Sequence, residues 1–169
     1  NSSRLSHHVR KLNQMNQAML LVVDDDDVNR LTLTRRLTRE GFCNIREAHH
    51  GREALDMLET ESFDLVLLDV IMPEMNGYQL LETMQTRPAM RDIPVIIVSA
   101  LSEEASAIKC IELGAVDYLF KPVNPVLLRA RIRACLDRRR LQQKLFLALT
   151  EFRTMLEISP LAIALVKEE

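Results

Sequence analysis

The chain has 169 residues, of which 47% are hydrophobic, and its formal net charge is -2. This size fits one domain with additional segments, and no stretch approaches the roughly 18 uninterrupted apolar residues that a membrane-spanning helix needs. The small negative charge predicts no general affinity for nucleic acid. The odd count of cysteines (3, without metal-type spacing) predicts reduced thiols in a cytoplasmic protein rather than a disulfide framework.

Short apolar runs alternate with amphipathic stretches along the chain. The runs predicted to be strands are 19–25, 44–49, 65–70, 94–100 and 117–120. The stretches predicted to be helices are 28–40, 51–61, 78–86 and 103–113, and a long helical pattern follows Pro125. Gly41 and Gly114 are expected to end the first and fourth of these helices, because glycine readily takes the conformation that stops a helix.

The alternation of strands and helices predicts a doubly wound α/β fold with a five-stranded parallel sheet. We expect the flavodoxin-like strand order 2-1-3-4-5, in which the first and third strands are neighbours. Leu31, Leu33 and Leu37 are expected to form the apolar stripe by which the first helix packs on this sheet.

Charged residues stand where three of the predicted strands end. Asp24 and Asp25 follow the first apolar run, Asp69 follows the third, and Lys121 follows the fifth. The carboxyl ends of parallel strands meet at one edge of the sheet, so these side chains should lie close together. Carboxylates gathered in this way are costly unless a cation binds between them. The pattern therefore predicts a hard divalent metal ion, with a lysine nearby for a further anion.

Four segments, in this order, resemble the receiver domain of two-component response regulators over residues 18–138. They are VVDDDDVNR, LVLLDVIMPEMNGYQLL, PVIIVSA and GAVDYLFKPV. The resemblance implies that Asp69 accepts a phosphoryl group from the phosphohistidine of a histidine kinase or histidine phosphotransfer protein. It implies Mg²⁺ as the cofactor, with Asp25 and Asp69 as direct ligands, Asp24 acting mostly through a coordinated water, and the backbone carbonyl of Ile71 completing the set.

The resemblance also implies roles for the residues around the acceptor. Lys121 would pair with Asp69 before phosphorylation and with a phosphoryl oxygen after it. The Ser99 hydroxyl would donate to another phosphoryl oxygen and so start a switch that Tyr118 follows. In the family, two further positions tune the lifetime of the phosphorylated form, and here both are apolar, Ile71 and Leu101. Neither side chain can hold a water for attack, so we expect at most slow self-dephosphorylation and no enzymatic turnover.

Other interpretations of the acidic run remain open. Residues 24–28 contain D-x-D-x-V, which resembles the nucleophile motif of haloacid dehalogenase phosphatases, a family that also uses magnesium and a later lysine. That family needs a further acidic pair, and only Asp137 is near the expected place. A receiver-like platform that binds partners without phosphorylation is another alternative. Asp26 or Asp27 is interpreted as the N-cap of the first helix.

The two ends of the chain are interpreted as linkers. Residues 1–17 are predicted to be an N-terminal extension or linker helix, and residues 139–169 a helical linker in which the segment 151–166 resembles the opening of a PAS sensor domain. The output domain would then lie outside this chain. The arginine-rich stretch 138–140 is interpreted as a solvated basic helix rather than as a DNA contact.

An apolar heptad pattern begins beyond Arg138. It consists of Leu141, Leu145, Ala148, Phe152 and Met155, with spacings of 4, 3, 4 and 3 residues. This pattern predicts a helical seam that pairs in a parallel homodimer or joins the chain to a following domain. The alternative is that the stripe folds back on the same chain.

Overall fold

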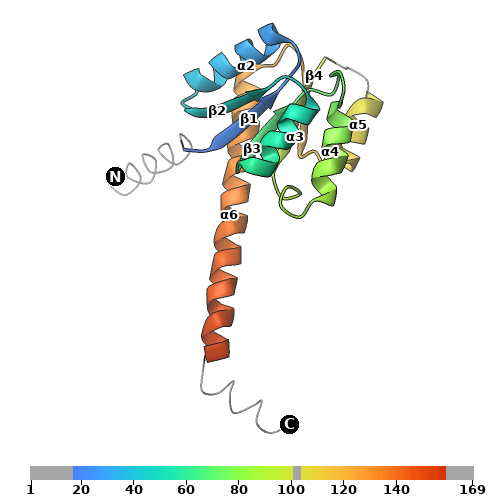
Figure 1. Ribbon diagram of the computed structural model, residues 1–169. Helices are drawn as coiled ribbons and strands as arrows, with labels where there is room; N and C mark the ends of the chain where they lie inside the picture. The colour runs from blue at the N-terminus through green and yellow to red at the C-terminus, as the bar shows by residue number, and fades with distance from the viewer. Residues whose placement is uncertain (1–16, 101–103, 159–169) are drawn as a thin grey trace, which may run out of the picture. The chain divides into compact units, whose positions relative to one another are not determined.

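The structure is a computed structural model that describes residues 17–100 and 104–158 (Figure 1). The chain forms two compact units, residues 1–136 and residues 137–169. The predictions for residues 1–16, for Leu101 and for residues 159–169 lie outside the described residues. Within the described part of the chain, no helix combines the length and the apolar character that a membrane crossing requires.

The first unit is built on a five-stranded parallel sheet in the order β2-β1-β3-β4-β5, as predicted. The strands are β1 (Met19–Val23), β2 (Asn44–Ala48), β3 (Leu65–Leu68), β4 (Val95–Ser99) and β5 (Asp117–Phe120). Both β1 and β3 end two residues earlier than predicted. Asp24, Asp25 and Asp69 therefore lie in the loops that follow these strands rather than in the strands themselves.

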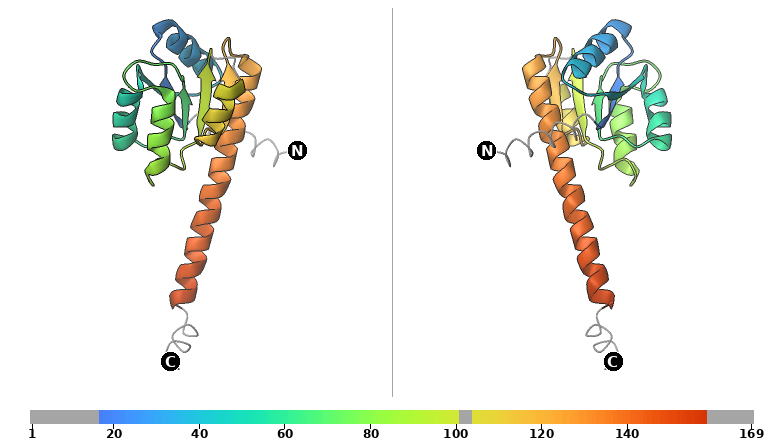
Figure 2. Two further views of the ribbon diagram at one scale, coloured as in Figure 1. Left: turned by 90° about the vertical axis from the view of Figure 1, so that its right-hand side faces the viewer. Right: turned by 90° about the vertical axis from the view of Figure 1, so that its left-hand side faces the viewer.

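Helices cover both faces of the sheet (Figures 1 and 2). They are α2 (Asp27–Arg39), α3 (Gly51–Thr60), α4 (Gly77–Thr86), α5 (Glu104–Glu112) and α6 (Pro125–Ile158). Residues of α3, α4 and α5 pack on one face, and residues of α2 and of the first turns of α6 pack on the other. Successive residues of a strand point to opposite faces, so Leu20 and Leu21 of β1 belong to different cores. Burial on both sides explains why β1 and β3 are apolar without alternation.

The ends of the helices follow from local chemistry. Asp26 is the N-cap of α2, since its side chain accepts a hydrogen bond of 2.8 Å from the backbone nitrogen of Asn29. Gly41 and Gly114 have φ angles of 93° and 100° just after α2 and α5, which confirms both predicted stops.

One prediction about α2 is wrong. Leu31 is 47% exposed and does not belong to the stripe that packs on the sheet. The buried positions of this helix are Arg30, Leu33 and Leu37. These are spaced by three and four residues and so share one face, whereas Leu31 lies to the side of that face.

Candidate functional site

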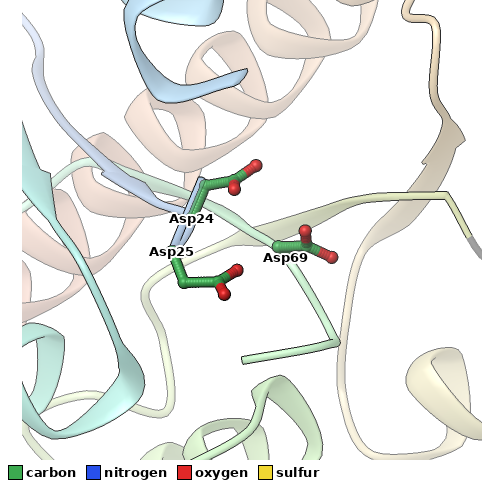
Figure 3. A group of neighbouring side chains, drawn as sticks. All are labelled: Asp24, Asp25 and Asp69. Carbon is green, nitrogen blue, oxygen red and sulfur yellow. The ribbon is translucent and has the colours of Figure 1, made fainter. Parts of the chain in front are cut away.

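Three carboxylates converge at the carboxyl edge of the sheet. One oxygen from each of Asp24, Asp25 and Asp69 lies within 4.8 Å of the other two (Figure 3). Asp24 and Asp25 lie in the β1–α2 loop and Asp69 lies in the β3–α4 loop. These loops are adjacent because β1 pairs directly with β3, with Val23 opposite Leu68. The strand pairing therefore brings together carboxylates that are about 45 residues apart along the chain.

The ammonium group of Lys121 lies between two of these carboxylates. Its Nζ is 2.6 Å from Oδ2 of Asp24 and 2.6 Å from Oδ2 of Asp69. The backbone nitrogen of Lys121 donates a hydrogen bond of 2.9 Å to the carbonyl oxygen of Ser99, which holds the end of β5 beside the end of β4. The peptide bond between Lys121 and Pro122 is cis.

Burial makes these charges costly, and the pairing with lysine reduces that cost. Asp24 and Asp69 are 3% and 8% exposed. Burial raises the pKa of Asp24, although hydrogen bonds from Lys121 and from the backbone of Asp26 oppose this effect. Burial also tends to lower the pKa of Lys121, but its hydrogen bonds with the two aspartates and their charges outweigh burial and raise that pKa. Lys121 is therefore an ammonium ion at neutral pH.

Asp69 is held by hydrogen bonds on both of its carboxylate oxygens. Oδ1 accepts bonds from the backbone nitrogens of Val70, at 2.6 Å, and Ile71, at 3.3 Å, whereas Oδ2 faces Lys121. The backbone nitrogen of Asp69 donates to the carbonyl oxygen of Val23 at 2.9 Å. A carboxylate with this arrangement keeps one oxygen engaged by the backbone and can offer the other as a nucleophile once Lys121 shifts.

Ser99 and Tyr118, the two residues expected to form a switch, contact each other. Ser99 is the last residue of β4 and is fully buried, and Tyr118 lies on the neighbouring strand β5. Burial raises the pKa of the Tyr118 phenol, and a hydrogen bond with the Ser99 side chain opposes this effect. The Tyr118 ring also packs against Phe120, with 5.1 Å between the ring centroids.

The donor atoms of this pocket fit a hard divalent cation. Carboxylate and carbonyl oxygens are the ligands that Mg²⁺ prefers, and Mg²⁺ usually keeps several waters, which suits a pocket with few protein ligands. Three carboxylates against one ammonium leave two negative charges when all four groups are ionised. Asp25 is exposed, and Ile71, whose carbonyl is the expected further ligand, lies in the loop after Asp69 and is 57% exposed. The pocket is therefore open to solvent on one side.

Arg30 also lies in this region and is not among the site residues predicted from the sequence. Its guanidinium is buried and donates a hydrogen bond of 2.8 Å to the backbone oxygen of Asp24. A signal for it exists in the sequence. Arg30 precedes Leu33 by three residues and Leu37 by seven, which places a charged side chain on the buried face of α2.

Comparison with known proteins gives a family for this fold and site. The response regulator receiver domain family matches residues 20–133. The transcriptional regulatory protein CpxR of Escherichia coli is 44% identical over 119 residues, which are 70% of this chain and 49% of CpxR. Response regulator PleD of Caulobacter vibrioides is 38% identical over 117 residues, which are 69% of this chain and 26% of PleD. The chain spans about half or less of the length of the curated relatives it matches.

Solved structures of response regulators have a similar fold. A putative response regulator from Chloroflexus aurantiacus aligns with a TM-score of 0.68 at 32% identity, covering 71% of this chain and 98% of that one. A probable two-component system response regulator/GGDEF domain protein aligns with a TM-score of 0.72 at 30% identity, covering 78% of this chain and 54% of that one.

Proposed function

The chain belongs to the response regulator receiver domains of two-component signalling systems, and on this premise we propose that phosphorylation of Asp69 switches it. The phosphoryl donor is a phosphohistidine of a histidine kinase or histidine phosphotransfer protein, and Mg²⁺ is required. One observation carries the proposal. Asp24, Asp25 and Asp69 share one pocket, in which the Lys121 ammonium bridges the first and the third. The alternative of a haloacid dehalogenase phosphatase is not supported, because the family match and the relatives are response regulators.

The hydrogen bonds of Asp69 support a specific reacting atom. Oδ1 is engaged by two backbone nitrogens, so Oδ2 is the oxygen that attacks phosphorus. The bond from phosphorus to Oδ2 forms as the bond to the donor imidazole nitrogen breaks, and that nitrogen keeps the electron pair. Lys121 moves from Oδ2 to a phosphoryl oxygen, where its charge is again paired. Bound Mg²⁺ would neutralise the charge of the transferring group, with Asp24, Asp25, Asp69 and the Ile71 carbonyl as its protein partners.

The contact between Ser99 and Tyr118 supports a route by which the pocket signals outward. A hydroxyl group is both a donor and an acceptor, so Ser99 can donate to a phosphoryl oxygen while it accepts from the Tyr118 phenol. Phosphorylation of Asp69 would therefore shift Tyr118 on β5 through its hydrogen bond with the Ser99 hydroxyl. The chain itself has at most slow self-dephosphorylation, because the exposed side chain of Ile71 offers no group that positions a water.

The output is passed on through α6. We assign residues 18–138 to the receiver domain, residues 1–17 to an N-terminal extension, and residues 139–169 to a helical linker that leads into a PAS-like segment. In the second unit, Leu141, Leu145, Phe152 and Met155 are each more than half exposed. Such a stripe favours a parallel homodimer or contact with an output module in a cytoplasmic protein.

The experiment that tests the proposal is phosphorylation with a small donor. The purified chain is mixed with acetyl phosphate and Mg²⁺, and its intact mass is measured. We expect a stable increase by one phosphoryl group that is lost on adding a chelator beforehand and in Asp69→Asn, but kept in Asp56→Asn, an exposed aspartate on α3. Continuous phosphate release without an adduct would indicate a phosphatase. The absence of both adduct and release would indicate a docking platform.

A further inference from the structure

The loop between β1 and α2 carries two of the three carboxylates of the acidic pocket. Asp24 is buried, and Asp25 follows it directly and is exposed. The peptide group that joins these residues is planar, so its carbonyl group and the Cα atoms of Asp24 and Asp25 lie in one plane. A group that holds this carbonyl therefore limits how the backbone turns between Asp24 and Asp25, and with it the directions in which their side chains leave the backbone.

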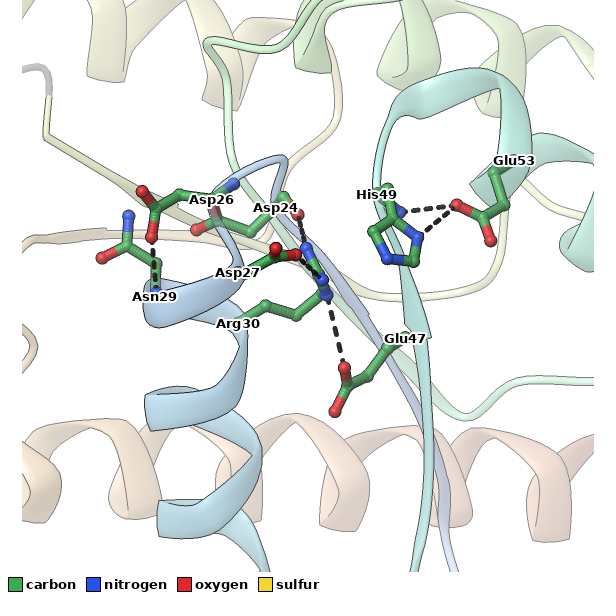
Figure 4. A network of polar contacts seen from close by, with 8 residues as sticks. All are labelled: Asp24, Asp26, Asp27, Asn29, Arg30, Glu47, His49 and Glu53. Atoms are coloured by element: carbon green, nitrogen blue, oxygen red, sulfur yellow. Dashed lines mark hydrogen bonds and ion pairs between the residues drawn. The ribbon is translucent and has the colours of Figure 1, made fainter.

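Arg30 holds this carbonyl from the first turn of α2. Its Nη1 donates to the backbone oxygen of Asp24 at 2.8 Å, Nη2 pairs with the Asp27 carboxylate, and Nε lies 3.3 Å from Oε2 of Glu47 on β2 (Figure 4). A guanidinium presents its donors in fixed directions within one plane. Arg30 thus links the β1–α2 loop to the start of α2 and to the edge strand β2.

The two carboxylate partners do not account for the burial of Arg30, which is 5% exposed. The side chains of Asp27 and Glu47 are 83% and 36% exposed. Water screens ion pairs of this kind, and they add little to stability. Burying a guanidinium is costly, and an apolar side chain in its place often leaves a protein as stable or more so. The buried bond to the Asp24 carbonyl is the contact that water does not screen, and the planar guanidinium gives this bond a fixed direction.

We propose that Arg30 is a positioning residue of the metal site, which acts through the Asp24 carbonyl and keeps the Asp25 carboxylate turned toward Asp24 and Asp69. This inference rests on the proposed function of the pocket as a Mg²⁺ site. Groups that orient metal ligands change metal affinity by about 10–100-fold when they are replaced. Loss of Arg30 should therefore weaken Mg²⁺ binding about tenfold, although no ligand is removed.

The charge of Arg30 predicts the opposite result. A positive group beside the pocket repels Mg²⁺, so a neutral side chain at this position should tighten binding if only electrostatics matter. A purely structural role predicts a lower unfolding temperature with an unchanged Kd for Mg²⁺. A higher Kd for Mg²⁺ therefore indicates positioning, a lower Kd indicates an effect of charge alone, and an unchanged Kd indicates a purely structural role.

The experiment is a Mg²⁺ titration of the full chain, followed through backbone amide resonances, which also report whether each variant is folded. Arg30→Met removes all donors and keeps a long apolar side chain. Glu47→Gln is the matched control, because it removes one ion pair of Arg30 and leaves the bond to the Asp24 carbonyl. We expect the Kd for Mg²⁺ to rise about tenfold in Arg30→Met and to stay within about twofold of the wild-type value in Glu47→Gln.

An unchanged or lower Kd in Arg30→Met would overturn the role of Arg30 while leaving the metal site intact, and so would an equal loss in Glu47→Gln. If Arg30→Met does not fold, Arg30→Lys decides, since it keeps the charge and loses the fork. Weaker binding in that variant supports positioning, and an unchanged Kd overturns it. A wild-type chain whose Asp25 and Val70 amides do not respond to Mg²⁺ would overturn the metal site itself, and this inference with it.

Discussion

The side chain of Lys121 determines how the pocket is held together when it contains no metal. Two buried carboxylates, Asp24 and Asp69, share this one ammonium at 2.6 Å each. Leaving these two carboxylates without a cation is much more costly than pairing them, because they repel each other and have lost most of their water. A lysine suits the proposed role because its single charged group can move between partners, whereas an arginine fork prefers a fixed geometry.

This residue therefore gives a prediction about stability. In Lys121→Met without Mg²⁺, we expect the free energy of unfolding to fall by about 2–3 kcal/mol, less than for a fully buried pair because Lys121 is partly exposed. Added Mg²⁺ should recover most of this loss, and the rise in unfolding temperature with Mg²⁺ should be larger than in the wild type. Thermal unfolding followed by circular dichroism measures both effects. Lys144→Met, an exposed lysine of α6, is the control. A loss of stability that Mg²⁺ does not reduce would contradict this account.

At the scale of elements, the start of α4 closes the loop that carries Asp69. Gly77 is the first residue of this helix, and its backbone nitrogen donates a hydrogen bond of 2.9 Å to the carbonyl oxygen of Val70. Asn76 and Gln79 form a capping box at the same end. A Cβ atom at Gly77 would lie 2.8 Å from the Cα of Val70 and would also collide with the backbone oxygen of Asp69. The helix can approach the Asp69 loop this closely only because Gly77 has no side chain.

The close approach predicts an unusual effect for a helical glycine. Replacing glycine by alanine within a helix normally stabilises it by about 1 kcal/mol. Here we expect Gly77→Ala to destabilise the protein by about 1–3 kcal/mol, because the backbone of the Asp69 loop must shift. Phosphorylation by acetyl phosphate should also slow in this variant. Urea unfolding measures the first effect, and Glu82→Ala, an exposed position of the same helix, should change stability by less than about 0.5 kcal/mol. An increase in stability in Gly77→Ala would show that the loop is not tightly held.

At the scale of the whole molecule, the exposed apolar side chains of the second unit indicate how copies of the chain associate. Leu149 and Leu156 are each exposed and follow the seam residues Ala148 and Met155 directly, so the apolar face is wider than the heptad pattern alone. A helix face of this width is normally covered by other helices. The parallel homodimer proposed above would cover it with the same face of a second chain.

The proposed dimer predicts a concentration-dependent association that charge on the seam abolishes. We expect the full chain to sediment as a dimer, and the double variant Leu145→Glu, Phe152→Glu to sediment as a monomer, because paired glutamates at the seam are desolvated and repel each other. Gln143→Glu, Thr154→Glu adds the same charge away from the seam and should leave the dimer intact. If both double variants sediment alike, the seam is not the dimer interface.

The sequence by itself determined the strand order and the meeting of the strand-end carboxylates. Parallel strands with intervening helices allow few topologies, and Asp24 and Asp69 each come directly after a central apolar run. The helix stops at Gly41 and Gly114 were likewise predictable, and the N-cap of α2 was narrowed to Asp26 or Asp27, because these features depend on neighbouring residues alone.

Only the tertiary structure decided which face of α2 is buried, and hence that Arg30 rather than Leu31 lies against the sheet. It also decided that Lys121, expected to pair with Asp69, pairs with Asp24 as well, and that Gly77 contacts the Asp69 loop. These features depend on distances between residues that meet only after the sheet has assembled. Local sequence determines the period of a helix and the end of a strand, but the direction in which each then faces is set by what packs against it.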